Sequence, residues 1–153
     1  MAGELRLVLG GSDAIATAAA VSDARELQRL VSIAAELVAS QNSYLIRKLG
    51  RRRIPPLYSS GVVYRQDPPE WDLATAGNAR FLYMPTADEI VRQGWTDCKG
   101  AVPYRLADLR LENPHLNYGV HTYVRRNGRD LMVHLQVSMP TGEIEDPSRL
   151  LQQ

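Results

Sequence analysis

The stretch "YGVHTYVRRNGRDLMVHLQVS", residues 118–138, alternates apolar and polar side chains on both sides of Asn127-Gly128. Alternation with a period of two is typical of a β-strand with one buried face, and Asn-Gly best fits a two-residue hairpin turn. The stretch therefore predicts a β-hairpin centred on this dipeptide. Its register would place four pairs opposite each other: Arg126 and Arg129, Arg125 and Asp130, Thr122 and Val133, and His121 and His134.

The two faces of this hairpin differ in chemistry. The same alternation places one set of side chains on an apolar face: Val120, Val124, Leu131, Val133, Leu135 and Val137. The other face is more polar and carries Tyr123, Met132, His134 and Gln136. An apolar face of this size needs a cover, so we expect a helix to pack on it.

A third strand is predicted for "EIEDPS", residues 143–148, after the turn "PTG", residues 140–142. A three-residue loop that ends in a left-handed glycine would set Met139 opposite Glu143. Asp146 would then share the face of His134 as its diagonal neighbour. A two-residue loop would turn Asp146 to the opposite face, but the glycine and proline of the turn favour the longer loop.

The first third of the chain predicts one long amphipathic helix over residues 22–49. Ser22 and Asp23 are candidate caps, and Gly50 is its expected end. Its apolar residues recur with a helical period: Leu27, Leu30, Val31, Ala34, Leu37, Val38 and Leu45. Residues 1–21 are expected to form an N-terminal arm and not a signal peptide, because glycines and acidic residues interrupt their apolar run.

The middle of the chain is less regular. Paired prolines in "RRRIPPLYSS" end the first helix, and "GVVYR", residues 61–65, is expected to form a short strand. Residues 66–88 have no period and predict a long loop of the functional kind. A second helix is expected from Cys98 to the "LENP" stretch, with Pro103 causing a bend or a tight opening turn.

Composition limits the class of protein. With 153 residues, of which 44% are hydrophobic and 23% charged, the chain fits a single α+β domain over residues 1–153. A net charge of +1 gives no specific signal for a nucleic acid, and no apolar stretch is long enough to predict a membrane helix. The basic cluster at residues 47–53 is interpreted as the solvated end of the first helix. A single cysteine permits no internal disulfide, so a reducing compartment is expected.

That cysteine has the neighbours that a nucleophile needs. Cys98 lies at a predicted helix start, where the helix dipole and unpaired amides favour thiolate and could bind an oxyanion. His134 could accept its proton, and Asp146 could orient the imidazole. On this hypothesis Cys98 is at least partly accessible. Four further residues are candidate supports of the site: Trp95, Asp97, Gln136 and His121.

Two other interpretations stay open at this point. A lone cysteine is often a buried filler with no reactivity. The predicted pairing of His121 with His134 would also allow a metal site with Cys98 and a carboxylate, although no short ligand spacing supports one. We therefore expect no metal and no cofactor.

Two motifs resemble those of transglutaminase-like cysteine proteins of the papain-like superfamily. "TDCKGAVPYRLADLRL" is similar to their cysteine helix, and "VHLQVSMPTGEIEDPSRL" is similar to their histidine strand, turn and aspartate strand. With "YRQDPP" before the cysteine, the chain most resembles the variant encoded by bacteriophages and prophages, over residues 22–151. It departs from that pattern at Lys99 and Gly100, where acidic residues are common, and at Pro103.

The resemblance implies a fold and a chemistry. The fold would have a long N-terminal helix on the apolar face of a small antiparallel sheet, and the cysteine helix on the face that carries His134. Cys98 would be the nucleophile, His134 the base and acid, and Asp146 the orienting group, acting on a peptide or isopeptide carbonyl of a protein or peptide substrate. The family also has inactive members, so the alternative is a catalytically silent virion structural protein that binds other virion proteins. The expected location is the bacterial host cytoplasm or, for the alternative, the phage particle.

Overall fold

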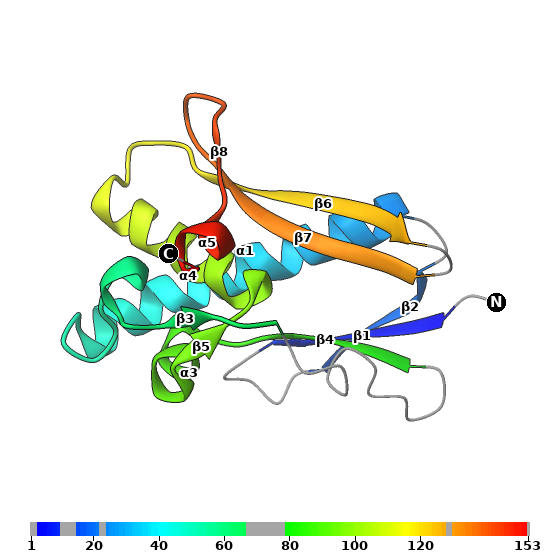
Figure 1. The fold of residues 1–153 in the computed structure, drawn as a ribbon, viewed down its shortest axis with the longest axis horizontal. Helices are drawn as coiled ribbons and strands as arrows, with labels where there is room; N and C mark the ends of the chain where they lie inside the picture. The colour runs from blue at the N-terminus through cyan, green and yellow to red at the C-terminus, as the bar shows by residue number, and fades with distance from the viewer. Residues whose placement is uncertain (1–2, 10–14, 22–23, 67–78, 128–129, 153) are drawn as a thin grey trace.

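The computed structural model describes residues 3–9, 15–21, 24–66, 79–127 and 130–152. The fold is a mixed α+β arrangement with a long N-terminal helix and a small antiparallel sheet (Figure 1). Among the described residues, no helix combines the length and the apolarity that crossing a bilayer requires.

The predicted hairpin is present as β6 (Gly119–Asn127) and β7 (Asp130–Ser138). Its register differs from the prediction, because Asn127 pairs with Asp130 and Tyr123, not His121, lies opposite His134. This shift by two residues sets Val124 opposite Val133, and β-branched residues pair well across strands. A shift of two leaves every side chain on its predicted face.

The turn into the third strand follows the longer of the two predicted loops. β8 (Ile144–Glu145) pairs with β7 so that Glu145 lies opposite Val137. The Met139 amide donates to the Glu143 carbonyl at 2.8 Å, and Gly142 has the left-handed φ of 88° that this loop requires. The predicted register of Asp146 relative to His134 is therefore confirmed.

Both predicted helices are confirmed. α1 (Ala24–Leu49) ends at Gly50, whose φ of 84° lets its amide donate to the Ile46 carbonyl. The candidate caps Ser22 and Asp23 lie outside the described residues. α4 (Cys98–Glu112) continues through Pro103, which removes one hydrogen bond from the helix interior.

The two helices lie side by side on the apolar face of the sheet. α1 contacts β6, α4 contacts β7, and the helices contact each other (Figure 1). The expectation that α4 packs on the face of His134 is therefore wrong. The physical reason lies in α4 itself, because it is buried on most of its sides and needs both α1 and the apolar strand face as neighbours. The shared core contains Val31, Ala35, Val38, Cys98, Val102, Leu106, Leu135 and Val137.

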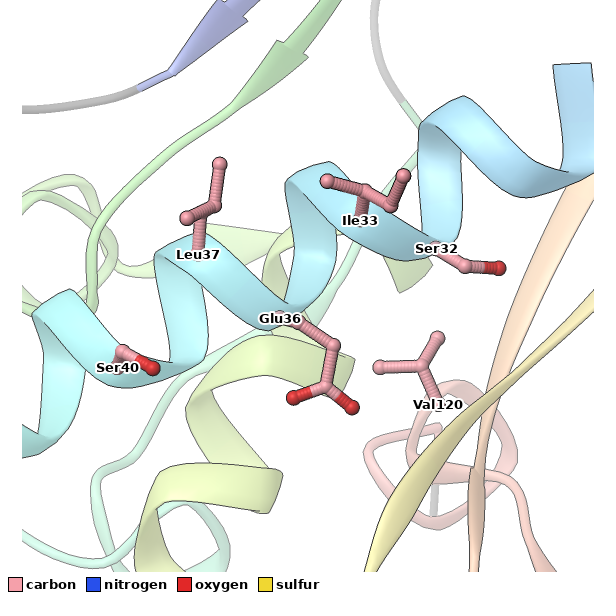
Figure 2. Close-up of a pocket in the computed structure, with 6 residues that line it drawn as sticks. All are labelled: Ser32, Ile33, Glu36, Leu37, Ser40 and Val120. Carbon is pink, nitrogen blue, oxygen red and sulfur yellow. The ribbon is translucent and has the colours of Figure 1, made fainter.

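Two residues of the predicted apolar stripe are not part of this core, because Leu45 packs against a second cluster and Leu37 is exposed. Leu37 is 56% exposed, and Ile33, one turn before it, is 51% exposed. Figure 2 shows both side chains on the same side of α1, with Glu36 directed toward Val120 of β6. All the residues labelled in that figure, Ser32 and Ser40 included, line a hollow of about 310 Å³. No residue of the predicted triad lines this hollow.

The segments expected to be an arm and a long loop contain regular structure. β1 (Gly3–Leu9) pairs antiparallel with β2 (Ile15–Val21) and parallel with β4 (Ala79–Met84). The parallel pairing joins segments far apart in sequence, which local patterns do not reveal. The loop prediction is therefore wrong for residues 79–84, and residues 67–78 lie outside the described part.

The end of the expected loop begins another helix. α3 (Ala87–Gln93) starts with a capping box, in which Thr86 and Glu89 each satisfy a backbone amide of the other. It leads to β5 (Trp95–Thr96), which pairs in parallel with β3 (Val63–Tyr64), the predicted short strand. A 3-10 helix, η1 (Leu57–Ser59), follows the paired prolines.

Candidate active site

Cys98 is the first residue of α4, as predicted. The helix begins there because the carboxylate of Asp97 accepts hydrogen bonds from the amides of Lys99 at 3.0 Å and Gly100 at 3.3 Å. These two amides are therefore engaged by the cap, and of the first three amides of α4 only that of Cys98 stays outside it. The oxyanion site expected from several amides is reduced to this one donor.

The thiol is more deeply buried than predicted. Cys98 is 6% exposed, which contradicts the expectation of partial access. Burial, together with the negative charge of Asp97, raises the pKa of the Cys98 thiol to about 12. A hydrogen bond from the backbone of Leu135 and the charge of Lys99 oppose this rise, and the charge of Asp146 adds to it. The thiol is therefore neutral in this state.

The residue after the cysteine forms a buried ion pair. Lys99 and Asp97 pair through Nζ and Oδ2, and their side chains are only 9% and 6% exposed. A lysine within the first turn of a helix opposes the dipole, and the capping carboxylate offsets its charge. Lys99 thus completes the helix start, where the sequence alone presented it as a departure from a pattern.

A glycine is needed at position 100 for steric reasons. A Cβ at this position would lie 2.9 Å from Ile90 Cδ1 and 3.0 Å from Pro85 Cγ, and would collide with the Thr96 hydroxyl. The start of α4 therefore packs tightly against α3 and β5, which fixes the position of Cys98.

His134 and Asp146 meet as predicted. His134 Nε2 lies 2.8 Å from Asp146 Oδ2, and Gln136 Nε2 donates to the same oxygen at 3.2 Å. Burial would raise the pKa of Asp146, but hydrogen bonds from Ser148, His134 and Gln136 hold it below its ordinary value. The carboxylate is then ionised at neutral pH and can only accept, so Nε2 carries the ring proton and Nδ1 is the acceptor of a neutral imidazole.

The second oxygen of Asp146 has its own partners. Asp146 caps α5 (Pro147–Leu150), and its Oδ1 accepts from the Ser148 amide at 3.1 Å and the Ser148 hydroxyl at 2.5 Å. Sequence reasoning missed Ser148, although aspartate followed by proline at the first helical position is a known start signal. The short helix thus holds the carboxylate in place.

Cys98 and His134 are linked through the main chain. Leu135, whose backbone hydrogen-bonds the thiol, directly follows His134 in β7. The strand therefore carries the imidazole on the residue directly before the one whose backbone contacts the sulfur, with the ring on the polar face. Asp146 is close enough for its charge to act on the thiol.

A second cluster ties the aspartate strand to the cysteine helix. Glu145 of β8 accepts from Arg105 of α4 at 2.8 Å and from the Tyr58 hydroxyl at 2.7 Å. The Arg105 guanidinium also lies over the Tyr58 ring, 4.8 Å from its centre. The contact fixes the residue next to Asp146 relative to the helix that carries Cys98.

A buried aspartate secures the same helix next to this cluster. Asp108 of α4 is fully buried, and it accepts from the Leu57 amide at 2.8 Å and from Arg51 at 2.5 Å. Burial raises the pKa of Asp108 against the effect of these bonds.

Two residues of the predicted basic cluster form ion pairs. Arg51 pairs with Asp108, and Arg53 pairs with Asp88 at 3.0 Å.

The other candidate supports have different surroundings. Trp95 lies on β5, with the Arg65 guanidinium 5.5 Å from the centre of its ring. His121 is exposed and lies opposite Gln136, so the pairing of histidines on which the metal alternative depended is wrong. Among the described residues, no group of three or more His, Cys, Asp or Glu side chains is arranged to hold a metal ion.

Tyr64 is a neighbour of the thiol that the sequence did not reveal. Burial raises the pKa of Tyr64, and the charges of Cys98 and Asp97 add to this effect. β3 therefore borders the site. The tyrosine falls in the "YRQDPP" stretch, but no local pattern connects it with Cys98.

Comparison of the chain with protein-family models, with curated proteins and with solved structures finds no match. The geometry of the site is therefore the basis for any functional conclusion.

Proposed function

We propose that the protein is a cysteine-dependent acyltransferase or hydrolase that acts on a peptide or isopeptide carbonyl through Cys98, His134 and Asp146. One observation carries this proposal: Asp146 engages Nε2 of His134 at 2.8 Å, which leaves Nδ1 as the proton acceptor. The backbone contact of Leu135 with the thiol supports it, because it sets the sulfur beside that strand. The resemblance to bacteriophage-encoded transglutaminase-like proteins of papain-like fold agrees with this arrangement.

The neutral thiol determines the order of the chemical steps. Nδ1 of His134 takes the proton of Cys98 as the sulfur attacks the carbonyl carbon, and the carbonyl electron pair moves to its oxygen. The amide of Cys98 donates to that oxyanion. The carbon–nitrogen bond then breaks, and the leaving amine takes the proton from His134.

A thioester on Cys98 remains after the amine leaves. Water or a second amine attacks its carbonyl carbon while His134 accepts a proton from the attacking group. The carbon–sulfur bond breaks, the sulfur regains a proton from His134, and an acid or a new amide is released. Asp146 stabilises the imidazolium in both steps and itself stays ionised.

A second function is favoured by the burial of the sulfur. A thiol that is 6% exposed with a pKa of about 12 is the state expected of a structural cysteine. The exposed apolar side chains of Ile33 and Leu37 on α1 would suit a docking surface. The alternative proposal is thus a catalytically silent virion protein that uses this fold for assembly.

A paired assay separates the two functions. Dimethylcasein with dansylcadaverine reports acyl transfer to an amine, and release of new amino groups from casein reports hydrolysis. The enzyme proposal expects turnover by the wild type that is lost in Cys98→Ser and His134→Ala and kept in His121→Ala, since His121 is exposed on the neighbouring strand. Turnover that survives in Cys98→Ser, or its absence from every form in both assays, would favour the silent protein.

A further inference from the structure

The edge of β7 that faces β8 is only partly used. β8 pairs with residues Val137 and Ser138 alone, although β7 begins at Asp130. Within the described part of the chain, no strand pairs with this edge between Asp130 and Gln136. Figure 1 shows β7 extending well beyond the position of β8.

The direction of the main-chain groups along this edge follows from one hydrogen bond. The Met139 amide donates to Glu143, on the side of β8. Main-chain groups alternate between the two sides of a strand, so those of Leu135 and Val133 point to the same side as those of Met139. The contact between the Leu135 backbone and the Cys98 sulfur agrees with this direction.

The end of β8 has a chemical cause. If β8 continued in the same register, Pro147 would lie opposite Leu135, a position at which a strand must donate an amide hydrogen. Proline has none, and Asp146 instead turns the chain into α5. On this edge the backbone of Leu135 therefore contacts the thiol instead of a strand. Among the described residues, no strand pairs with Val133 on the same edge.

We propose that this edge binds the substrate as an added β-strand, so that an extended polypeptide segment pairs with Val133 and its reacting carbonyl reaches Cys98 beside Leu135. A strand edge that ends at a nucleophile recognises the main chain, which makes the substrate an extended segment of a protein and not a compact small amide. This binding mode rests on the function proposed above.

The face of the sheet suggests what side chains such a segment would carry. Met132 is 55% exposed and lies on the same face as His134, two residues before it. Alternate side chains of an added strand would lie beside Met132 on this face, so an apolar residue is preferred there. The remaining side chains would face α1 and α4.

Alkylation of the single cysteine provides the test. The probes are random-sequence hexapeptides that carry an iodoacetyl group at either end, and iodoacetamide is their peptide-free reference. Two further libraries are N-methylated at every second residue, in the two alternating phases. In an added strand, every second amide faces β7 and the others face solvent. Methylation of the amides that face β7 should therefore reduce the rate advantage over iodoacetamide roughly tenfold, and methylation of the other amides should leave it unchanged.

Val133→Pro removes the amide at the edge without removing a bond to β6, because that amide points away from β6. Val133→Ala is the matched control, since it shortens the side chain and keeps the amide. We expect the peptide advantage to disappear in Val133→Pro and to persist in Val133→Ala. Equal loss in both variants, or equal effects of the two methylation phases, would overturn edge binding.

A second measurement separates this binding mode from the catalytic proposal. Amide hydrogen exchange of Val133 is followed in Cys98→Ser with the acetyl forms of the same peptides, which cannot alkylate. If the peptides protect Val133 and the alkylation rate of Cys98 is the same in the wild type and in His134→Ala, the binding edge is retained and the catalytic proposal is rejected. Exchange of Val133 that is unchanged by the peptides would reject the edge, whatever the thiol does.

Discussion

Unfolding the chain should speed the alkylation of Cys98 by about a thousandfold near neutral pH. The pKa of the buried thiol is about 12, against an ordinary value of 9.0. Each unit of pKa changes the thiolate fraction about tenfold when the pH lies below both values, so three units give about three powers of ten. Restricted access to a sulfur that is 6% exposed would widen the difference.

The measurement is the rate of iodoacetamide adduct formation by mass spectrometry, in native buffer and in concentrated guanidinium chloride. The signal comes from one residue because the chain has one cysteine, and Cys98→Ser gives the background. A native rate equal to the unfolded rate, or a rate inflection below about pH 8.5, would refute the burial described for this thiol.

The same shift links stability to alkaline pH. The folded state favours the neutral thiol, so this contribution is complete below the ordinary pKa of 9.0 and is lost as the pH rises toward about 12. Three units correspond to about 4 kcal/mol of the free energy of unfolding. Urea denaturation of Cys98→Ala should show a smaller loss over this range than the wild type, and equal losses would contradict the shift.

Four further changes test the site and its support. His134→Ala should lower turnover by about 10² to 10⁴ while His121→Ala stays close to wild type, and equal losses in the casein assays would argue for a shared network. Asp146→Asn should lower turnover by about 10⁴. It should also reduce the loss of stability on acidification, since the pKa of this carboxyl is lowered in the folded state, and an unchanged dependence of stability on acidic pH would contradict its contacts. Gly100→Ala should destabilise the fold by about 1–3 kcal/mol in urea, and a neutral effect would exclude the tight packing at the start of α4. Asp108→Ala should cost about 3–5 kcal/mol because it leaves a buried amide and a guanidinium uncompensated, which a wild-type denaturation midpoint would refute.

The parts of the fold that the sequence revealed depend on local signals. The alternation of residues 118–138 and the "PTG" turn placed His134 and Asp146 on one face, and Gly50 marked the end of α1. The hairpin register was less certain, because a shift of two residues preserves both faces and therefore leaves no trace in the pattern.

The errors involve contacts between distant segments. β4 pairs with β1 across most of the N-terminal half, and no local period announces a parallel partner. The burial of Cys98 depends on how α1, α4 and β7 pack together, whereas its position at a helix start was visible from Asp97 and the following pattern. Ser148 could have been found, since an aspartate that caps a helix accepts from the residue two positions later.

The two oxygens of Asp146 divide two tasks between them, since Oδ1 starts α5 and Oδ2 holds His134. A single carboxylate thereby makes the alignment of the imidazole depend on the folding of a four-residue helix. An amide side chain has only one acceptor oxygen, so it could serve one task and would turn a donor toward the other. Under the proposed function, a single substitution of Asp146 would therefore abolish catalysis and leave the helix in place, and a catalytically silent protein would keep the whole fold.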